Sequence, residues 1–578
     1  MTTFEGTSPA RPATPSRDGV SGALKEYVRK HPVQAVETAG SQIVLGVRAM
    51  QYMFSDIVHR AFPWREFIHQ GAFMAGSAVV PTLLVAIPIG VTLSIQFALL
   101  AGQVGASSLA GAASGVAIVR QGASLVAAVL MASAVGSAIT ADLGSRTMRE
   151  EIDAMEVMGV SVIRRLVVPR VAAAVLVGVG LTGTTCFVGF LASYLFNVYF
   201  QHGAPGSFVA TFASFTRVDD LVLALLKAIL YGLIVAIVAC DKGLTTKGGP
   251  AGVANSVNAA VVESILVLML INVLVSQVYV MVFPGTGYRG RAMTISTYRP
   301  KGVQPIIDAG QRIAQSIRRL GHMLAFFVEA IASIPNALRY YSKEFFRLLA
   351  DVTWGNGSLV TGGGTVGVAA VLGATIGALI GIEAYNLLNI IGLGPATGFI
   401  SSLVSTRELA PVMAALAFAM QAGCRFTAQL GAQRINEEID ALDALAIRPI
   451  PYLVTTRLLA STVAVVPLYL LCLVISYITC RLLVGISSGG SIGGAYNHYF
   501  TMMLSGTDVV YSVIKAVVFV WIASTIQCYF GFNASGGPEG VGVAAGHAMR
   551  AAITVVIIVN MLLTMALWGV DAGARFGG

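Results

Sequence analysis

The sequence predicts an all-α, polytopic membrane protein built from two tandem modules of about five transmembrane helices each, with an interfacial helix near the N-terminus. Its 578 residues are 56% hydrophobic and only 11% charged, whereas a soluble domain carries about a quarter charged residues. No Asp, Glu, Lys or Arg occurs in 67–119, 171–216 or 264–288. Each of these stretches exceeds the roughly 20 residues that span a hydrocarbon core as a helix.

The two modules are revealed by blocks of sequence that recur at a nearly constant offset. Residues 136–154 (GSAITADLGSRTMREEIDA) and 423–441 (GCRFTAQLGAQRINEEIDA) are identical at ten of nineteen positions, at an offset of 287. Residues 243–253 (GLTTKGGPAGV) and 531–541 (GFNASGGPEGV) share six of eleven positions, at an offset of 288. A period this long indicates a duplicated domain rather than a solenoid repeat. Lone residues follow the same offsets, among them Gln96 with Glu383, Lys227 with Lys515 and Asn272 with Asn560.

From the N-terminus, residues 1–34 begin with a Pro-, Ser- and Thr-rich stretch and are expected to form a disordered cytoplasmic tail. This stretch lacks an apolar core, so it is not expected to be a cleaved secretory signal. Residues 35–76 mix apolar and basic residues and suit the interfacial helix. The first module is expected at 35–284 and the second at 341–578, joined by a basic connector with an interfacial helix at 285–340. The ten expected spans are 77–101, 119–141, 168–198, 221–240, 262–284, 362–385, 408–425, 455–485, 508–529 and 551–570.

Basic residues predict the orientation in the membrane. Lys and Arg gather in 146–170, 242–247 and 425–457, whereas 101–119 and 386–405 lack them. Because cytoplasmic loops are enriched in Lys and Arg, the first three segments are expected in the cytoplasm and the other two outside.

The connector conflicts with a count of five crossings. Five spans from a cytoplasmic start leave the first module ending outside, but 289–319 carries seven basic residues and belongs inside. Two explanations stay open. Either the modestly apolar 320–338 forms an extra crossing, or two formerly separate polypeptides are joined near Met293.

An acidic segment lies between the second and third spans of each module. In the first copy, Ile152, Met155 and Met158 recur at helical spacing and share one face. Such a helix is either a solvated element whose acids offset nearby arginines, or an element that docks an apolar ridge and a charged rim into a groove of a soluble partner. Its presence in both copies favours docking. The expected docking residues are Glu150, Glu151, Ile152, Asp153, Met155, Glu437, Glu438, Ile439, Asp440 and Leu442.

Paired glycines predict a tight turn on the other cytoplasmic loop of each module. Gly248-Gly249 and Gly536-Gly537 are each followed by Pro, and paired glycines permit positive φ. They also resemble a phosphate cradle, but a P-loop needs a following Gly-Lys. No Gly-Lys dipeptide occurs in the sequence. Turn geometry is therefore favoured over nucleotide binding.

Polar residues within the spans are candidates for an internal path. Gln96 and Glu383 occupy the same place in the first span of each copy. They either face the bundle interior or reach the outer interface, and both readings have equal weight because each residue lies near the end of its span. Arg120 marks the start of the second span in the first copy, and Arg407-Glu408 marks it in the second, so Arg120 lacks an acidic neighbour in sequence.

Small residues predict packing rather than chemistry. Gly373, Gly377 and Gly381 are four residues apart and form a stripe suited to close helix contact. The six cysteines lie in or beside apolar segments and are expected to pack as small apolar residues. No catalytic constellation emerges, and the seven histidines do not pair at metal-ligand spacings, so no cofactor is expected.

These segments resemble the MlaE/YrbE permease family, the membrane half of ABC lipid transporters that work with MCE proteins. The resemblance rests on RQGASLVAAVL, ADLGSRTMREEIDAMEVMG and GGPAGV in the first copy and on TRELAPVMAAL, AQLGAQRINEEIDAL and GFNASGGPEGVG in the second. The first copy is similar to the actinobacterial YrbE A permease and the second to YrbE B. The resemblance implies that helices at 146–159 and 433–446 engage a cytoplasmic ABC ATPase dimer. It also implies a central lipid path between the halves, capped outside by MCE proteins.

The leading interpretation is therefore a permease pair in a bacterial cytoplasmic membrane, which moves a lipid, sterol or fatty acid while a separate protein hydrolyses ATP. An ion-coupled secondary transporter stays open, with Lys227, Lys515 and Glu383 as its intramembrane ionisable candidates. A membrane-embedded lipid-modifying enzyme also stays open, although it needs an acid–base or metal cluster. The net charge of +9 comes mostly from segments beside apolar runs, which favours a membrane surface over nucleic acid as the partner.

The orientation can be tested by cysteine labelling. In a chain whose native cysteines are replaced, a single cysteine introduced near Arg149 or Arg434 should react with an impermeant reagent only after the cells are permeabilised. A cysteine in 101–119 or 386–405 should react in intact cells. Labelling of the two acidic segments from opposite sides would contradict the parallel arrangement of the modules.

Overall fold

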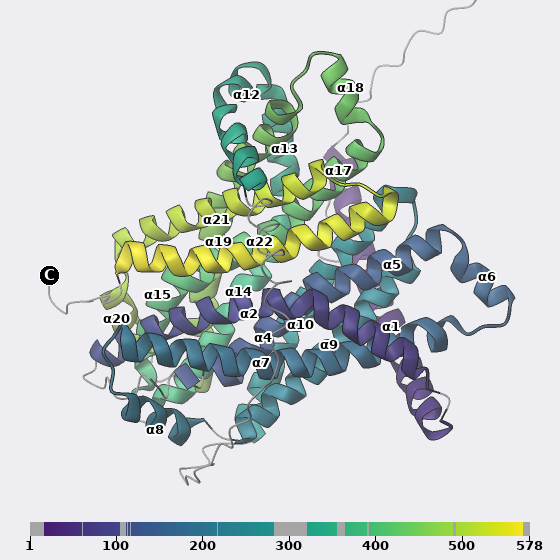
Figure 1. Ribbon diagram of the computed structural model, residues 1–578. Coiled ribbons are helices and arrows are strands. Elements are labelled where there is room, and N and C mark those ends of the chain that lie inside the picture. The colour runs from purple at the N-terminus through teal and green to yellow at the C-terminus, as the bar shows by residue number, and fades with distance from the viewer. Residues whose placement is uncertain are drawn as a thin grey trace, which may run out of the picture.

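The computed structural model describes residues 17–60, 62–103, 111, 114–115, 117–216, 218–282, 321–354, 364–389, 392–488 and 493–569. Its regular elements are helices (Figure 1). Within this part of the chain, ten helices are long and apolar enough to cross a membrane. The all-α architecture with two sets of five spans is confirmed. The spans are Trp64–Ala98, Ala117–Met148, Ile163–Tyr199, Val218–Leu244, Gly252–Tyr279, Gly364–Asn389, Gly394–Ile435, Ile450–Ser487, Gly506–Phe532 and Glu539–Trp568.

The first module is built from long helices joined by short turns. Its elements are α1 (Arg17–Val58), α2 (Trp64–Gln103), η2 (Ala117–Gly122), α4 (Ala123–Met131), η3 (Ala132–Gly136), α5 (Ser137–Met148), α6 (Glu151–Val157), η4 (Ile163–Val167), α7 (Val168–Tyr199), α8 (Pro205–Phe215), α9 (Val218–Leu244) and α10 (Gly249–Val282).

The second module repeats this order. A helix over Gly321–Ala332, bent by 46° from its successor, precedes α12 (Ile334–Tyr340), α13 (Ser342–Trp354), α14 (Gly364–Asn389), η6 (Gly394–Ala396), α15 (Thr397–Val404), η7 (Ser405–Leu409), α16 (Ala410–Phe418), η8 (Ala419–Gly423), α17 (Cys424–Ile435), α18 (Glu438–Ala444), η9 (Ile450–Thr455), α19 (Thr456–Ser487), α20 (Gly493–Met503), α21 (Gly506–Phe532) and α22 (Gly537–Trp568).

The second span of each module contains wide π-helical turns. They are η2 and η3 in the first module and η7 and η8 in the second, and η4 and η9 form a third matched pair before α7 and α19. A π turn inserts a residue into the helical repeat and is frequent at functional sites. The duplication therefore extends to irregular backbone geometry, which hydrophobic periodicity does not reveal.

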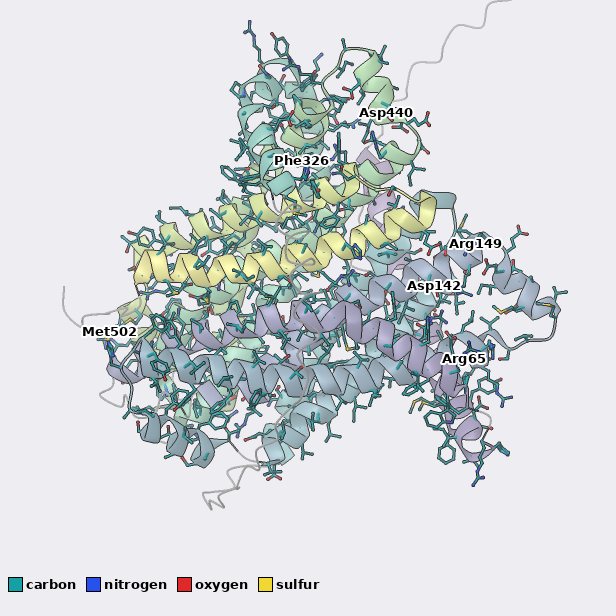
Figure 2. All side chains as sticks on the ribbon, viewed as in Figure 1. Arg65, Asp142, Arg149, Phe326, Asp440 and Met502 are labelled. Atoms are coloured by element: carbon teal, nitrogen blue, oxygen red, sulfur yellow. The ribbon has the colours of Figure 1, made fainter. Side chains whose placement is uncertain are left out.

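The two ends of the bundle differ. The acidic end carries α6 and α18, and the opposite end carries the short helices α8 and α20 (Figure 1). Arg149 and Asp440 lie at the acidic end, and Met502 lies at the opposite end (Figure 2). Helix α15 replaces much of the loop that was expected at 386–405.

The N-terminal region departs from its predicted boundaries. Helix α1 begins at Arg17, so helix occupies part of the 1–34 segment that was expected to be disordered. Helix α2 begins at Trp64, so residues 64–76 belong to the first span and not to the interfacial helix. Of the other expected features, residues 1–16, most of 101–119 and the basic segment around Met293 lie outside the described residues.

The segment 320–338, one of the two explanations that stayed open for the connector, forms a helix pair with a bend of 46°. By length and composition the bent helix pair could form an eleventh span within the described residues, but its contacts place both of its ends at the acidic end. The Phe326 ring packs against Tyr529 at 5.7 Å, and the Tyr341 ring packs against Tyr452 at 5.0 Å. Tyr529 lies near the end of α21 and Tyr452 lies in η9, and both of these segments are at the acidic end. The route of the chain between the modules falls on residues outside those described.

Glycine allows the first and third spans of each module to touch backbone to backbone. A Cβ on Gly377 of α14 would lie 2.1 Å from the Ser476 carbonyl oxygen of α19, and one on Gly373 would lie 2.5 Å from the Cys472 oxygen. In the first module, α2 meets α7 in the same way, at Gly90. Close approach of this kind increases van der Waals contact in lipid, where the hydrophobic effect does not drive helices together.

The two modules interlock along their inner helices. Helix α2 of the first module packs on α22 of the second, α10 packs on both α14 and α22, and α5 also contacts α22. One hydrophobic cluster contains buried residues of both modules, including Leu130, Ile265, Leu372 and Phe418. The modules therefore share a core, and any site between them is built from both.

The glycine contact predicts a specific loss of stability. Gly377→Ala should lower the free energy of unfolding by about 1–3 kcal/mol, because its methyl group would overlap a backbone carbonyl. Gly485→Ala in α19 is the control, because nothing lies within 4 Å of its Cβ position. Thermal unfolding of the detergent-solubilised chain should show a lower Tm for the first variant and an unchanged or higher Tm for the second. Equal Tm values would contradict the close contact.

Candidate functional site

A cavity of about 340 Å³ lies between the two modules. Helices α2 and α4 line it from the first module, and α14, α16 and α22 line it from the second. Most of its wall is aliphatic, with Leu125 and Val412 at equivalent positions of the two copies. Its polar lining residues are Thr92, Gln96, Gln121, Glu383, Glu408 and Asn560. Gln96 and Glu383 thus face the bundle interior and not the outer interface.

Glu408, in η7 of the second span of the second module, is the centre of a buried polar cluster that we call cluster II. Its Oε1 accepts hydrogen bonds from Gln96 Nε2 and Thr564 Oγ1, both at 2.8 Å, and its Oε2 accepts one from Asn560 Nδ2 at 2.8 Å. Lys515 Nζ lies 3.5 Å from Oε2 and donates to Thr564 Oγ1 at 2.9 Å. Cluster II comprises Gln96, Glu408, Lys515, Asn560 and Thr564.

The equivalent cluster I surrounds Gln121 in the first module. Gln121 Nε2 donates to Glu383 Oε1 at 2.5 Å and to Ser276 Oγ at 2.6 Å. Lys227 Nζ donates to Gln121 Oε1 at 3.2 Å, to Asn272 Oδ1 at 3.2 Å and to Ser276 Oγ at 3.1 Å. Cluster I comprises Gln121, Lys227, Asn272, Ser276 and Glu383.

The arginines that precede Gln121 and Glu408 point elsewhere, to aspartates at the start of the fourth spans. Arg120 Nε lies 2.7 Å from Asp220 Oδ1, and Arg407 Nη2 lies 3.0 Å from Asp508 Oδ2. The residues next to Arg120 in the sequence suggested that the first copy lacks an acidic partner for it. The structure supplies that partner from the fourth span, as Asp220. Glu408 is not the partner of Arg407, because it belongs to cluster II.

Burial explains why each lysine needs several partners. The Lys227 and Lys515 side chains are 1% and 0% exposed. A lone buried ammonium costs several kcal/mol, so intramembrane charges pair with other groups and face the bundle interior. The sequence marked these lysines as repeated polar residues in apolar spans but gave no signal for Asp220 or Asp508, whose roles depend on helix packing.

The acidic segments form the short helices α6 and α18, and the structure corrects their expected docking face. Ile152 is 7% exposed and Ile439 is 1% exposed, because each packs into its own module. The prediction that these isoleucines enter a partner's groove is therefore wrong. The exposed apolar side chains are Val157 at 88%, Met158 at 69% and Leu445 at 72%.

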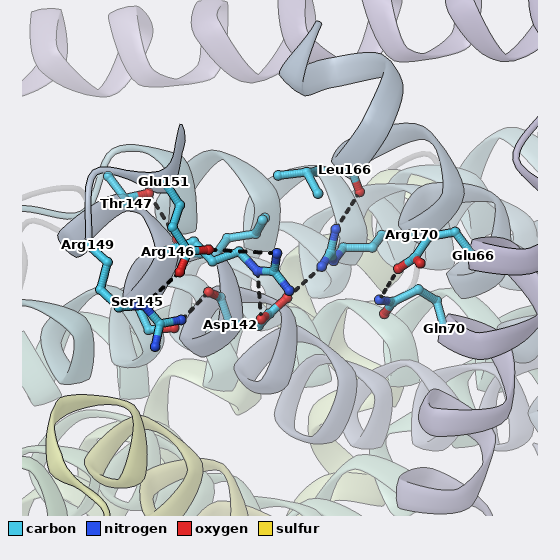
Figure 3. A network of polar contacts seen from close by, with 11 residues as sticks. Glu66, Gln70, Asp142, Ser145, Arg146, Thr147, Arg149, Glu151, Leu166 and Arg170 are labelled. Carbon is cyan, nitrogen blue, oxygen red and sulfur yellow. Dashed lines mark hydrogen bonds and ion pairs between the residues drawn. The ribbon is translucent and has the colours of Figure 1, made fainter. Parts of the chain in front are cut away.

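The acids of α6 and α18 fall into two groups. Glu151 and Asp440 pair with neighbouring arginines, at 2.9 Å from Arg149 and 2.6 Å from Arg434. Figure 3 shows the first of these pairs beside Asp142, which bridges two further arginines at the base of α6. The other acids point outward, and Met155 and Leu442 are half-buried. The exposed acidic side chains include Glu150, Asp153, Glu156, Glu437, Glu438 and Asp443.

The backbone before each acidic helix is left-handed. Glu150 has φ 57° and Glu437 has φ 59°, a conformation that few residues other than glycine adopt. The matched strain at equivalent positions indicates that the surrounding structure fixes the direction of both helices.

The paired glycines form the same turn in both modules. Gly248 and Gly536 have φ 92°, and Gly249 and Gly537 have φ 71°. Both φ values lie where side chains are strained, so the turn needs glycine at each position. These turns begin α10 and α22, the helices that supply Asn272 and Asn560 to the clusters.

Among the residues that the structure describes, no three or more His, Cys, Asp or Glu side chains form a group that could hold a metal ion. The six cysteines are buried thiols.

Comparison with known proteins finds relatives of each module. The family model described as "Permease MlaE" matches residues 67–278 and again 356–566. A probable ABC transporter permease protein of Synechocystis sp. is 32% identical over 41% of this chain and 88% of its own length. A probable ABC transporter permease protein of Rickettsia bellii is 30% identical over 44% and 92%. The chloroplastic protein trigalactosyldiacylglycerol 1 of Arabidopsis thaliana is 30% identical over 35% and 58%.

The two matched segments together cover more than half of the chain and coincide with the two repeats. Each contains one set of five spans, one acidic helix and one paired-glycine turn. The chain is therefore a transporter permease and belongs to the MlaE permease family, with two copies of the family module in tandem.

Proposed function

We propose that this chain is the complete membrane-spanning pair of an ABC transporter that moves an amphipathic lipid across a bacterial cytoplasmic membrane. A separate ATPase dimer binds at the acidic end, and MCE proteins bind at the opposite end. The lipid passes between the modules through the central cavity. Fatty acids, phospholipids and sterols all belong to this substrate class.

The observation that carries the proposal is the cavity. Its aliphatic wall suits an acyl chain or a ring system, and its polar residues gather on clusters I and II, where a head group would be solvated. The name of the Arabidopsis relative refers to a glycolipid, which supports a lipid as the substrate here.

The cavity also offers acceptors for a polar head group. A carboxylate only accepts hydrogen bonds, so Gln96 and Asn560 must turn their NH₂ groups towards Glu408. This orientation leaves Gln96 Oε1 and Asn560 Oδ1 buried without a partner in the described part of the chain. Hydroxyl groups of the substrate would satisfy them, with one donor for each oxygen.

The acidic end supplies a surface on which the ATPase can bind and through which ATP hydrolysis can be coupled to transport. The sequence contains no Gly-Lys dipeptide for a P-loop, so in this proposal nucleotide binds to the partner. Met158 and Leu445 stand at equivalent positions, exposed and beside exposed acids. Apolar anchors within a charged rim suit a groove on the ATPase that has basic edges.

Filling the cavity should block binding of lipid. Leu125→Trp with Val412→Trp places a large ring at equivalent positions of the wall, so lipid that co-purifies with the chain should fall at least tenfold by mass spectrometry. ATP-driven transport in proteoliposomes should fall to a similar degree. The matched control is Leu176→Trp with Val463→Trp, at equivalent positions that are 60% and 51% exposed on the outside of α7 and α19.

Two results of this experiment would contradict the proposal. Normal lipid content and transport in the cavity variant would show that lipid does not pass through the cavity. Transport by the chain alone, driven by an ion gradient without an ATPase, would favour the secondary transporter.

A charge at each of the two apolar anchors, Met158 and Leu445, should prevent the ATPase from binding and driving transport. Met158→Asp with Leu445→Asp should abolish co-purification of the ATPase and ATP-driven transport, because both anchors would then carry charge into an apolar groove. The chain should still be folded and retain its lipid. Met502→Asp at the opposite end is the control, since this residue is 50% exposed. Normal ATPase binding by the double variant would exclude these residues as anchors.

The buried isoleucines should behave differently. Ile152→Ala or Ile439→Ala removes core packing and should lower the free energy of unfolding by about 2–5 kcal/mol. Measured by thermal unfolding, this loss should appear even without the ATPase. An unchanged Tm with lost ATPase binding would restore the isoleucines to the docking face.

A further inference from the structure

At two equivalent positions the first module carries amides where the second module carries carboxylates. The first span carries Gln96 in the first copy and Glu383 in the second. The second span carries Gln121 in the first copy and Glu408 in the second. The first module therefore has amides at both positions, and the second module has carboxylates at both.

Two contacts join these residues to each other, and both cross from one module to the other. Gln96 Nε2 donates to Glu408 at 2.8 Å, and Gln121 Nε2 donates to Glu383 at 2.5 Å. In each contact, an amide of the first module meets a carboxylate of the second.

Both clusters therefore hold the same kinds of group. Each contains one lysine, one carboxylate, two side-chain amides and one hydroxyl, which is Ser276 in cluster I and Thr564 in cluster II. The carboxylate is Glu383 in cluster I and Glu408 in cluster II. In cluster II the lysine and the carboxylate lie 3.5 Å apart, whereas in cluster I the Gln121 amide joins them, because it accepts from Lys227 and donates to Glu383. Each buried lysine thus shares its cluster with a single negative charge, which comes from the first span in cluster I and from the second span in cluster II.

We infer that these two contacts select pairing between unlike modules and disfavour pairing between like ones. Two first modules would place Gln96 against Gln121, and each buried Lys227 would then lack a carboxylate. Two second modules would place Glu383 against Glu408, with two carboxylates for each Lys515. Only the unlike pair gives every lysine one carboxylate and every carboxylate an amide donor.

The energetic basis is the low dielectric constant of the interface. Gln96 and Glu408 are each 4% exposed, and the two lysines are at most 1% exposed. Removing one partner of a buried ion pair strongly destabilises a protein, and two carboxylates that share a site repel each other. Specificity of this kind arises from the penalty on the wrong pair as much as from attraction in the right one. The inference concerns assembly and holds whatever molecule the cavity takes.

Two double variants of the full chain test the inference, and both keep the composition and net charge of the native chain. The first, Gln121→Glu with Glu383→Gln, exchanges the two groups within cluster I and leaves one carboxylate in each cluster. The second, Gln96→Glu with Glu383→Gln, exchanges them between clusters, so cluster I loses its carboxylate and cluster II gains a second one.

The exchange within cluster I should leave the Tm within about 2 °C of the native chain, whereas the exchange between clusters should lower it by roughly 5 °C or more. The second variant also makes like modules complementary, since a carboxylate at position 96 would meet Gln121 of another chain. Pull-down of two differently tagged chains expressed together should therefore rise at least twofold for this variant alone.

Three results would overturn the inference. Equal destabilisation of both variants would show that each residue acts at its own position and not through the charge balance of its cluster. Native stability of both would show that the balance does not matter. A lower Tm for the exchange between clusters, without any increase in pull-down, would show a stability effect that does not govern pairing.

Discussion

The structure depends on keeping two lysine side chains charged inside a bundle that is otherwise apolar. Lys227 and Lys515, on the fourth spans, contact groups from the second and fifth spans of their own modules. The second-span partner in each cluster is in turn bonded to a first-span residue of the other module. Desolvation of an ammonium is so unfavourable that these partners must be in place together. This requirement fixes the register of four helices in each half and joins the halves, so the cavity can form only between correctly paired modules.

The duplication explains why so much of the fold could be predicted from the sequence. Uncharged stretches and repeated motifs located ten spans, because hydrophobicity and length alone define a membrane helix. Boundaries were less accurate, as the start of α2 at Trp64 shows. The segment 320–338 is a case that composition does not decide, because a moderately apolar helix that packs at the end of a bundle resembles a marginal span.

The candidate site was less accessible to sequence reasoning. Repetition pointed to Gln96, Glu383 and the acidic segments. The partners of Gln96 and Glu383 are residues more than 200 positions away, and three-dimensional packing decides those contacts. Periodicity placed Ile152 and Met158 on one face of a helix. It could not show that the chain itself covers the first part of this face and leaves the last part exposed.

The backbone contact between α14 and α19 has a consequence for motion. With Gly373 and Gly377 set against carbonyl oxygens, these helices can neither rotate nor slide without separating, and α2 is fixed to α7 in the same way. The first and third spans of each module should therefore move together as one rigid pair. Opening of the cavity then requires a hinge at the seam between the modules, where side chains, which can change rotamer, make the contacts.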